Sequence, residues 1–75
     1  MRRDKVTARE IQILELIGAG YEYKEIAGLL EISIHTVQST VTRSMYKLRS
    51  QNRTNAVINA LKKQAMTLEQ IPEYE

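Results

Sequence analysis

The sequence contains no cysteine and no tryptophan, and it has only one histidine and one proline among its 75 residues. Without thiols there is neither a disulfide nor a thiolate metal site, and a single histidine cannot build a zinc cluster with the residues that remain. A chain of this length buries only about 60% of the surface that its unfolded form exposes. We therefore expect one compact domain, stabilised by packed helices, by oligomerisation or by both.

Long apolar runs are missing too. The first five residues have a net positive charge, but no apolar segment of the signal-peptide kind follows them, and no run approaches membrane-spanning length. We expect a cytoplasmic protein without a membrane partner. The three glycines form no phosphate loop, and no catalytic triad can be assembled around one histidine. We therefore expect no enzyme, with no catalytic residues, no metal and no cofactor.

The charge is unevenly distributed along the chain. Residues 1–63 hold all eleven Lys and Arg against six acids, a net charge of +5, whereas residues 64–75 hold three Glu and no base, a net charge of −3. A basic body favours nucleic acid or another anionic surface, although +5 is a modest excess. We accordingly divide the chain into a domain at 1–66 and an acidic C-terminal tail at 67–75.

Capping signals and apolar spacing predict the first two helices. Thr7 and Glu10 have the capping-box arrangement, and Gly20 suits a left-handed C-cap, so the first helix should cover about 8–19. The apolar residues of the next segment recur at helical spacing, which predicts a second helix over about 23–30.

A third helix is predicted from Ile34 to about Arg49, although many of its residues are β-branched and would individually suit a strand. Ser33 can cap it after a turn of about three residues. The apolar residues recur at intervals of three, four, four and three, which forms one stripe on a helix but would scatter over both faces of a strand. They are Ile34, Val37, Val41, Met45 and Leu48. Two short helices joined this tightly form a helix-turn-helix.

A fourth helix should follow the polar segment 50–54, capped by Asn52 or Thr54, and its pattern weakens beyond Lys63. The remaining residues predict a frayed or packed-down tail. The fold class is therefore all-α, a compact four-helix domain with a central helix-turn-helix.

The side of the third helix away from its apolar stripe contains no acid. It carries amides, hydroxyls, rings and cations. These residues are His35, Gln38, Ser39, Thr42, Tyr46 and Arg49, with Arg43 beside them. Such a face suits contact with base edges and phosphates in the major groove.

Several spaced motifs resemble the LuxR/NarL/GerE-type DNA-binding domain, from about Val6 to Leu61. They are Val6–Glu10, Leu14–Gly20, Lys24–Ala27, Leu30–Ser33, Thr36–Val37, Lys47–Leu48 and Asn52–Val57. The resemblance implies a four-helix domain of transcription regulators that binds double-stranded DNA, commonly as a homodimer through its last helix.

The resemblance also implies residue roles. Lys24 and Lys47 would neutralise phosphates, and Thr36 would contact the backbone, with His35 and Tyr46 as supporting phosphate contacts. The bases would be read from the exposed face, by Gln38, Ser39, Thr42 and Arg43. The dimer interface would comprise Val57, Ile58 and Leu61.

The sequence departs from the family pattern in three places. Gln38 stands where the family commonly has Lys, Thr40 where it commonly has His, and Tyr23 where it usually has a small polar residue. From the first two departures we expect a lower affinity for DNA. Arg53 resembles a position that either binds phosphate or pairs with an acid such as Glu10.

Two other functions fit parts of the sequence. Residues 23–27 and 47–49 also resemble a sigma-factor region-four module, which would bind RNA polymerase as well as promoter DNA; the segment 52–57 and the fourth helix favour the LuxR-type interpretation instead. Gln38 and Thr40 support a different class, a module that has kept the fold but binds a regulatory protein rather than DNA.

Overall fold

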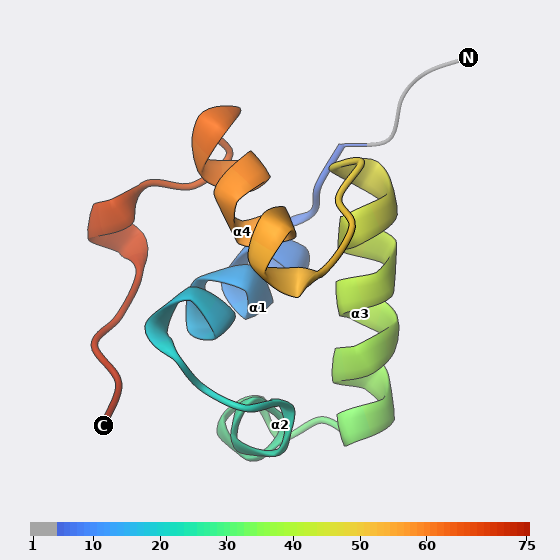
Figure 1. Cartoon of the computed structure of the whole chain (residues 1–75). Coiled ribbons are helices and arrows are strands. Elements are labelled where there is room, and N and C mark those ends of the chain that lie inside the picture. Colours follow the sequence, from blue (N-terminus) through green and yellow to red (C-terminus); the bar gives the residue numbers. More distant parts are fainter. Residues whose placement is uncertain (1–4) are drawn as a thin grey trace.

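The computed structural model describes residues 5–75, and its regular secondary structure is entirely helical (Figure 1). Its elements are α1 (Ala8–Ala19), α2 (Tyr23–Leu30), α3 (Ile34–Lys47), α4 (Arg53–Lys62) and the short 3-10 helix η1 (Leu68–Gln70). No strand occurs within these residues. The predicted all-α class and its four helices are confirmed, and α1 and α2 have the predicted bounds.

Local hydrogen bonds explain where α1 begins and ends. The hydroxyl of Thr7 accepts from the backbone N–H of Glu10 at 3.1 Å, and Glu10 Oε1 accepts from the backbone N–H of Thr7 at 2.8 Å. Gly20 ends the helix with a φ of 109°, a conformation that a residue with a Cβ rarely adopts. The predicted capping box and C-cap are both confirmed.

The turn between α2 and α3 is tight. Glu31 caps α2 with a φ of 58°, and Ser33 then caps α3 by accepting from the backbone N–H of Thr36 at 2.9 Å. The β-branched segment is helical as predicted, because Val37, Val41, Met45 and Leu48 of its apolar stripe pack into the core. Ile34, the first member of the predicted stripe, is instead 45% exposed. The helix ends at Lys47 rather than at Arg49, which has a φ of 52°. The predicted end of this helix was thus two residues too late.

The segment between α3 and α4 is fixed by amide side chains. Asn52 caps α4 by accepting from the backbone N–H of Asn55 at 2.8 Å. The side-chain amide of Asn59 donates to the Leu48 carbonyl at 3.1 Å and to the Ser50 hydroxyl at 2.9 Å. The end of α3 is therefore held against α4.

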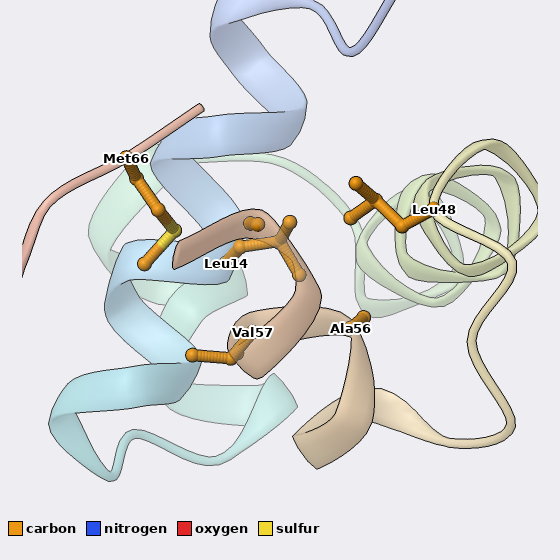
Figure 2. Close-up of a cluster of buried hydrophobic side chains, with 6 residues drawn as sticks. Leu14, Leu48, Ala56, Val57 and Met66 are labelled. Carbon is orange, nitrogen blue, oxygen red and sulfur yellow. The ribbon is translucent and has the colours of Figure 1, made fainter. Parts of the chain in front are cut away.

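Two clusters of buried apolar residues form the core. One lies between α1, the end of α3, α4 and the segment after α4, and its members are Leu14, Leu48, Ala56, Val57, Ala60 and Met66 (Figure 2). The other lies between α1, α2 and α3, and its members are Ile13, Ile26, Ala27, Val37 and Val41. Since α1 contributes to both clusters, it positions the helix-turn-helix relative to α4.

Residues 64–75 pack against the domain. Met66 is fully buried in the first cluster, and Ile71 packs so close to α1 that a Cβ on Gly18 would lie 3.2 Å from its Cδ1 atom. The ring of Tyr74 lies 4.7 Å from that of Tyr21. The chain runs from α4 down the side of the molecule away from α3 (Figure 1). Of the two predicted alternatives, the tail is packed down.

Candidate nucleic-acid interface

Helix α3 presents a polar surface that contains no acid. All fourteen of its residues are free of Asp and Glu. The exposed members of the predicted face on this helix are His35, Gln38, Thr42, Arg43 and Tyr46, and Thr36, the predicted backbone contact, is exposed as well. Ser39 is only half-buried, at the edge of this surface. The helix therefore places six predicted contact residues together and one more beside them.

At the start of α3 the hydroxyl groups are paired with each other. The Thr36 hydroxyl lies 2.9 Å from the Ser33 hydroxyl, which also accepts from the Thr36 backbone N–H. Both residues are exposed at the first turn, and His35 lies beside them. This first turn can present hydroxyl groups, an imidazole and the positive end of the helix dipole to an anion.

Thr40 is not part of the exposed face. It is buried, and its hydroxyl donates to the Thr36 carbonyl at 2.8 Å. Thr40 therefore offers DNA no polar group of its own, and the lower DNA affinity that we expect from Thr40 in place of His stays a prediction. A buried hydroxyl bonded within its own helix does not reach a duplex. Of the departures from the family pattern, Gln38 alone changes the exposed surface of α3.

The ammonium group of Lys47 points into the protein. Its side chain is 12% exposed, and Nζ donates to Glu10 Oε1 at 3.0 Å, to Glu10 Oε2 at 3.1 Å and to the Lys5 carbonyl at 3.1 Å. An ammonium group has three protons, so each of them has a partner here. Lys47 thus joins α3 to the start of α1, in a place where we expected a phosphate contact.

Glu10 is the residue that the sequence interpretation underestimated. Its side chain is 2% exposed, and besides its capping bond and Lys47 it accepts from Nε of Arg43 at 3.4 Å. Burial raises the pKa of Glu10. The hydrogen bonds from the Thr7 backbone, Lys47 and Arg43 together lower it by more, so the pKa lies below the ordinary 4.5. Glu10 is therefore a charged, buried link between α1 and α3.

Arg53 pairs with an acid, but with Glu22 rather than with Glu10. Its guanidinium lies 3.6 Å from Glu22 Oε1 and 4.8 Å from the centre of the Tyr23 ring. The sequence indicated an acid as one of two possible partners of Arg53 and gave Glu10 only as an example. Tyr23, one of the departures from the family pattern, therefore packs under this arginine and links α2 to α4.

Lys24 lies in the first turn of α2 and is exposed. It makes no ion pair with any of residues 5–75. Its charge is consequently available to an external anion, unlike that of Lys47.

The predicted dimer residues of α4 separate into two kinds. Val57 is 8% exposed and belongs to the core of the single chain, whereas Ile58 is 43% exposed. Leu61 is half-buried and packs against the first cluster. Val57 is poorly placed for the predicted dimer interface, because a side chain in the core has little surface that a second copy could contact.

Within residues 5–75, no three side chains of the His, Cys, Asp or Glu type are placed to hold a metal ion. In the same part of the chain, no helix combines the length and the apolar character needed to cross a membrane.

Comparison with known proteins identifies relatives for most of the chain. The family described as bacterial regulatory proteins, luxR family, matches residues 4–60. Response regulator protein VraR from Staphylococcus aureus (strain NCTC 8325 / PS 47), Staphylococcus epidermidis and Staphylococcus saprophyticus is in each case 46% identical over 57 residues. That match covers 76% of this chain but only 27% of each relative.

Proposed function

The chain belongs to the luxR family of bacterial regulatory proteins, and on that premise we propose that it binds double-stranded DNA sequence-specifically with α3 in the major groove. It is a helix-turn-helix domain of the class that binds DNA in transcription regulation. The relatives are named response regulators. We propose that this chain likewise regulates transcription, in the cytoplasm.

One observation supports this function above the others: the exposed side of α3 carries donors and acceptors for base edges and has no acid to repel phosphates. We assign the base contacts to Gln38, Ser39, Thr42 and Arg43. An amide can pair with adenine through two hydrogen bonds, and a guanidinium can pair with guanine in the same way.

We assign the backbone contacts to residues that surround this face, namely Lys24, His35, Thr36 and Tyr46. Lys24 supplies a full charge from α2, and the others supply hydrogen bonds from α3. Lys47 contributes through the Glu10 carboxylate that it holds. Because Arg43 is the one Lys or Arg of α3 that is exposed, we expect sequence-independent affinity to be low and specific contacts to matter more.

Selection from a pool of random duplexes, followed by a salt series on the selected site, tests the proposal. Binding to the selected site should fall steeply as salt rises, because each neutralised phosphate releases counterions. If the chain binds no duplex even at low salt, the proposal is wrong.

Two variants separate the kinds of contact. Arg43→Ala should cost about 1–3 kcal/mol on the selected site and little on random duplex. Lys24→Ala should weaken both by a similar factor and reduce the salt slope by about 1. Lys62→Ala, which removes an exposed lysine at the end of α4, is the control and should change neither.

We further propose a homodimer through α4, with Ile58 and Leu61 at the interface. Ile58→Gln should abolish cooperative binding to a two-fold related site while leaving binding to one half-site unchanged, as followed by solution mass and by titration. Leu29→Gln is a matched control, since Leu29 is as exposed but lies on α2. An equal loss of cooperative binding in both variants would contradict this interface.

RNA polymerase or a regulatory protein is an alternative partner for which no contact in residues 5–75 gives specific support. Adding RNA polymerase to the duplex titration checks it. Binding of the polymerase in the absence of DNA would favour the sigma-factor alternative.

A further inference from the structure

We propose that Glu10 is a positioning residue for DNA recognition: it tethers Arg43 so that the outer end of the guanidinium is presented to a base. This inference rests on the proposed function. It assigns to a helix-capping residue of α1, with no exposed surface of its own, an effect on which DNA sequences α3 prefers.

The Glu10 carboxylate is held in one place. Oε1 accepts from the Thr7 backbone N–H at 2.8 Å, and the Lys47 ammonium binds both oxygens. Lys47 is itself held by the Lys5 carbonyl at 3.1 Å. A buried carboxylate with bonds from both α1 and α3 cannot change its position without breaking several charged hydrogen bonds. It is therefore a fixed acceptor beneath the surface of α3.

Arg43 is tethered on its inner side only. Its Nε donates to Glu10 Oε2 and its Nη2 donates to the Thr40 hydroxyl, both at 3.4 Å. Among residues 5–75, Nη1 has no hydrogen-bond partner, and the side chain is 60% exposed. Both contacts are long, so they restrict the side chain rather than lock it. The protons that remain are those at the outer end, which is the end that can reach guanine O6 and N7.

Thr40 and Lys47 gain a role in this arrangement. Neither reaches the surface with its polar group, but Thr40 supplies the second acceptor for Arg43, and Lys47 fixes the carboxylate. Restricting a long side chain before binding reduces the entropy lost on binding, an effect that corresponds to about a two- to tenfold gain in affinity.

Charge gives the inference a distinctive signature. Replacing Glu10 by Gln keeps the shape but removes a negative charge close to α3, so attraction to any duplex should stay the same or increase. Affinity for the selected site should fall about two- to tenfold, because Arg43 loses its tether. A purely structural role would lower both affinities together.

The experiment measures Glu10→Gln, Arg43→Ala and the double variant against the selected site and against random duplex at one salt concentration. The ratio of the two affinities should fall in Glu10→Gln and should fall no further when Glu10→Gln is added to Arg43→Ala. An unchanged ratio in Glu10→Gln, or a further fall in the double variant, overturns the inference. Loss of all preference by the wild type would instead refute the proposed function.

A readout without DNA distinguishes these failures. The ¹⁵N relaxation of the Arg43 Nε–Hε group should show greater mobility in Glu10→Gln than in the wild type; equal mobility overturns the tether even if DNA binding is specific. Should Glu10→Gln fail to fold, Thr40→Val removes the other acceptor at nearly constant shape. It should then lower the affinity ratio in the same direction, and an unchanged ratio would contradict the inference.

Discussion

Two of the polar contacts that join distant parts of this chain are built in opposite ways. The polar clamp, which we define as Glu10, Arg43 and Lys47, joins α1 to α3 through a carboxylate that is 2% exposed. The tail contact, which we define as Tyr21, Glu25 and Tyr74, joins the C-terminal residues to the α1–α2 corner through a carboxylate at the surface. Both carboxyl groups have a lowered pKa.

The difference lies in where the stabilisation comes from. In the polar clamp, the charged groups of Glu10 and Lys47 are themselves largely buried, so the loss of either one leaves a desolvated charge on the other. In the tail contact, water can replace any partner of Glu25. The part of residues 64–75 that packs into the domain is apolar, with Met66 buried and Ile71 partly buried. Similar hydrogen bonds therefore contribute unequally to the stability of the fold, and the buried ones contribute more.

The largest effect should come from the buried methionine in the segment after α4. Met66 is 1% exposed, so Met66→Ala should lower the free energy of unfolding by about 3 kcal/mol through lost burial and a cavity. Leu68→Ala is the control, because Leu68 is 74% exposed, and it should change stability by less than about 0.5 kcal/mol. Urea unfolding measures both. Equal effects would show that the first cluster does not depend on this segment.

Met66 also shows what the sequence could not predict. The caps at Thr7, Gly20 and Ser33 were predictable because each depends on residues within one turn. A methionine after the last helix has no periodic partners, so nothing local marks it as buried. The same holds for Lys47, whose partner Glu10 is 37 residues away. The sequence predicted the helices and the exposed face of α3, but not which cations of that helix face inward.

The second largest effect should come from the polar clamp. Lys47→Met keeps the apolar stem but removes the ammonium group, leaving Glu10 with the Thr7 N–H and Arg43 as partners. We expect the free energy of unfolding to fall by about 2 kcal/mol, the usual cost of a charged group that loses a buried hydrogen bond. Lys62→Met, at an exposed lysine, should have little effect. If the two variants unfold alike, the clamp does not stabilise the fold.

Acid should remove the contribution of Glu10. Its pKa is lower in the folded chain than its ordinary value of 4.5, so the stability due to its charge is present above pH 4.5 and is lost as the pH falls below it. The free energies of unfolding of wild type and Glu10→Gln should therefore differ most near neutral pH and converge in acid. A constant difference at all pH values would mean that shape, rather than charge, distinguishes the two.

Glu25→Gln is the comparison for this pH series. The pKa of Glu25 is lowered by the Glu22 backbone N–H and by the Tyr74 hydroxyl, so its effect has the same sign. Because Glu25 lies at the surface, the difference between this variant and the wild type should be smaller at every pH. A larger pH effect for Glu25 than for Glu10 would reverse the comparison between the two contacts.

The smallest effect should come from Tyr74→Phe. The hydroxyl donates to Glu25 Oε2 at 2.5 Å, and the nearby carboxylate raises the pKa of Tyr74 above its ordinary 10.0. Removing the hydroxyl frees a surface carboxylate that water can solvate, while the ring still packs on Tyr21 and Met66 stays buried. The unfolding midpoint should match that of Tyr46→Phe, but the amides of Glu73, Tyr74 and Glu75 should exchange hydrogen faster, because the bond to Glu25 is gone and only the long contacts of Tyr21 with Glu73 and Glu75 remain. A fall in the midpoint as large as that of Lys47→Met would show that the exposed end of residues 64–75, and not the buried Met66, holds this segment to the domain.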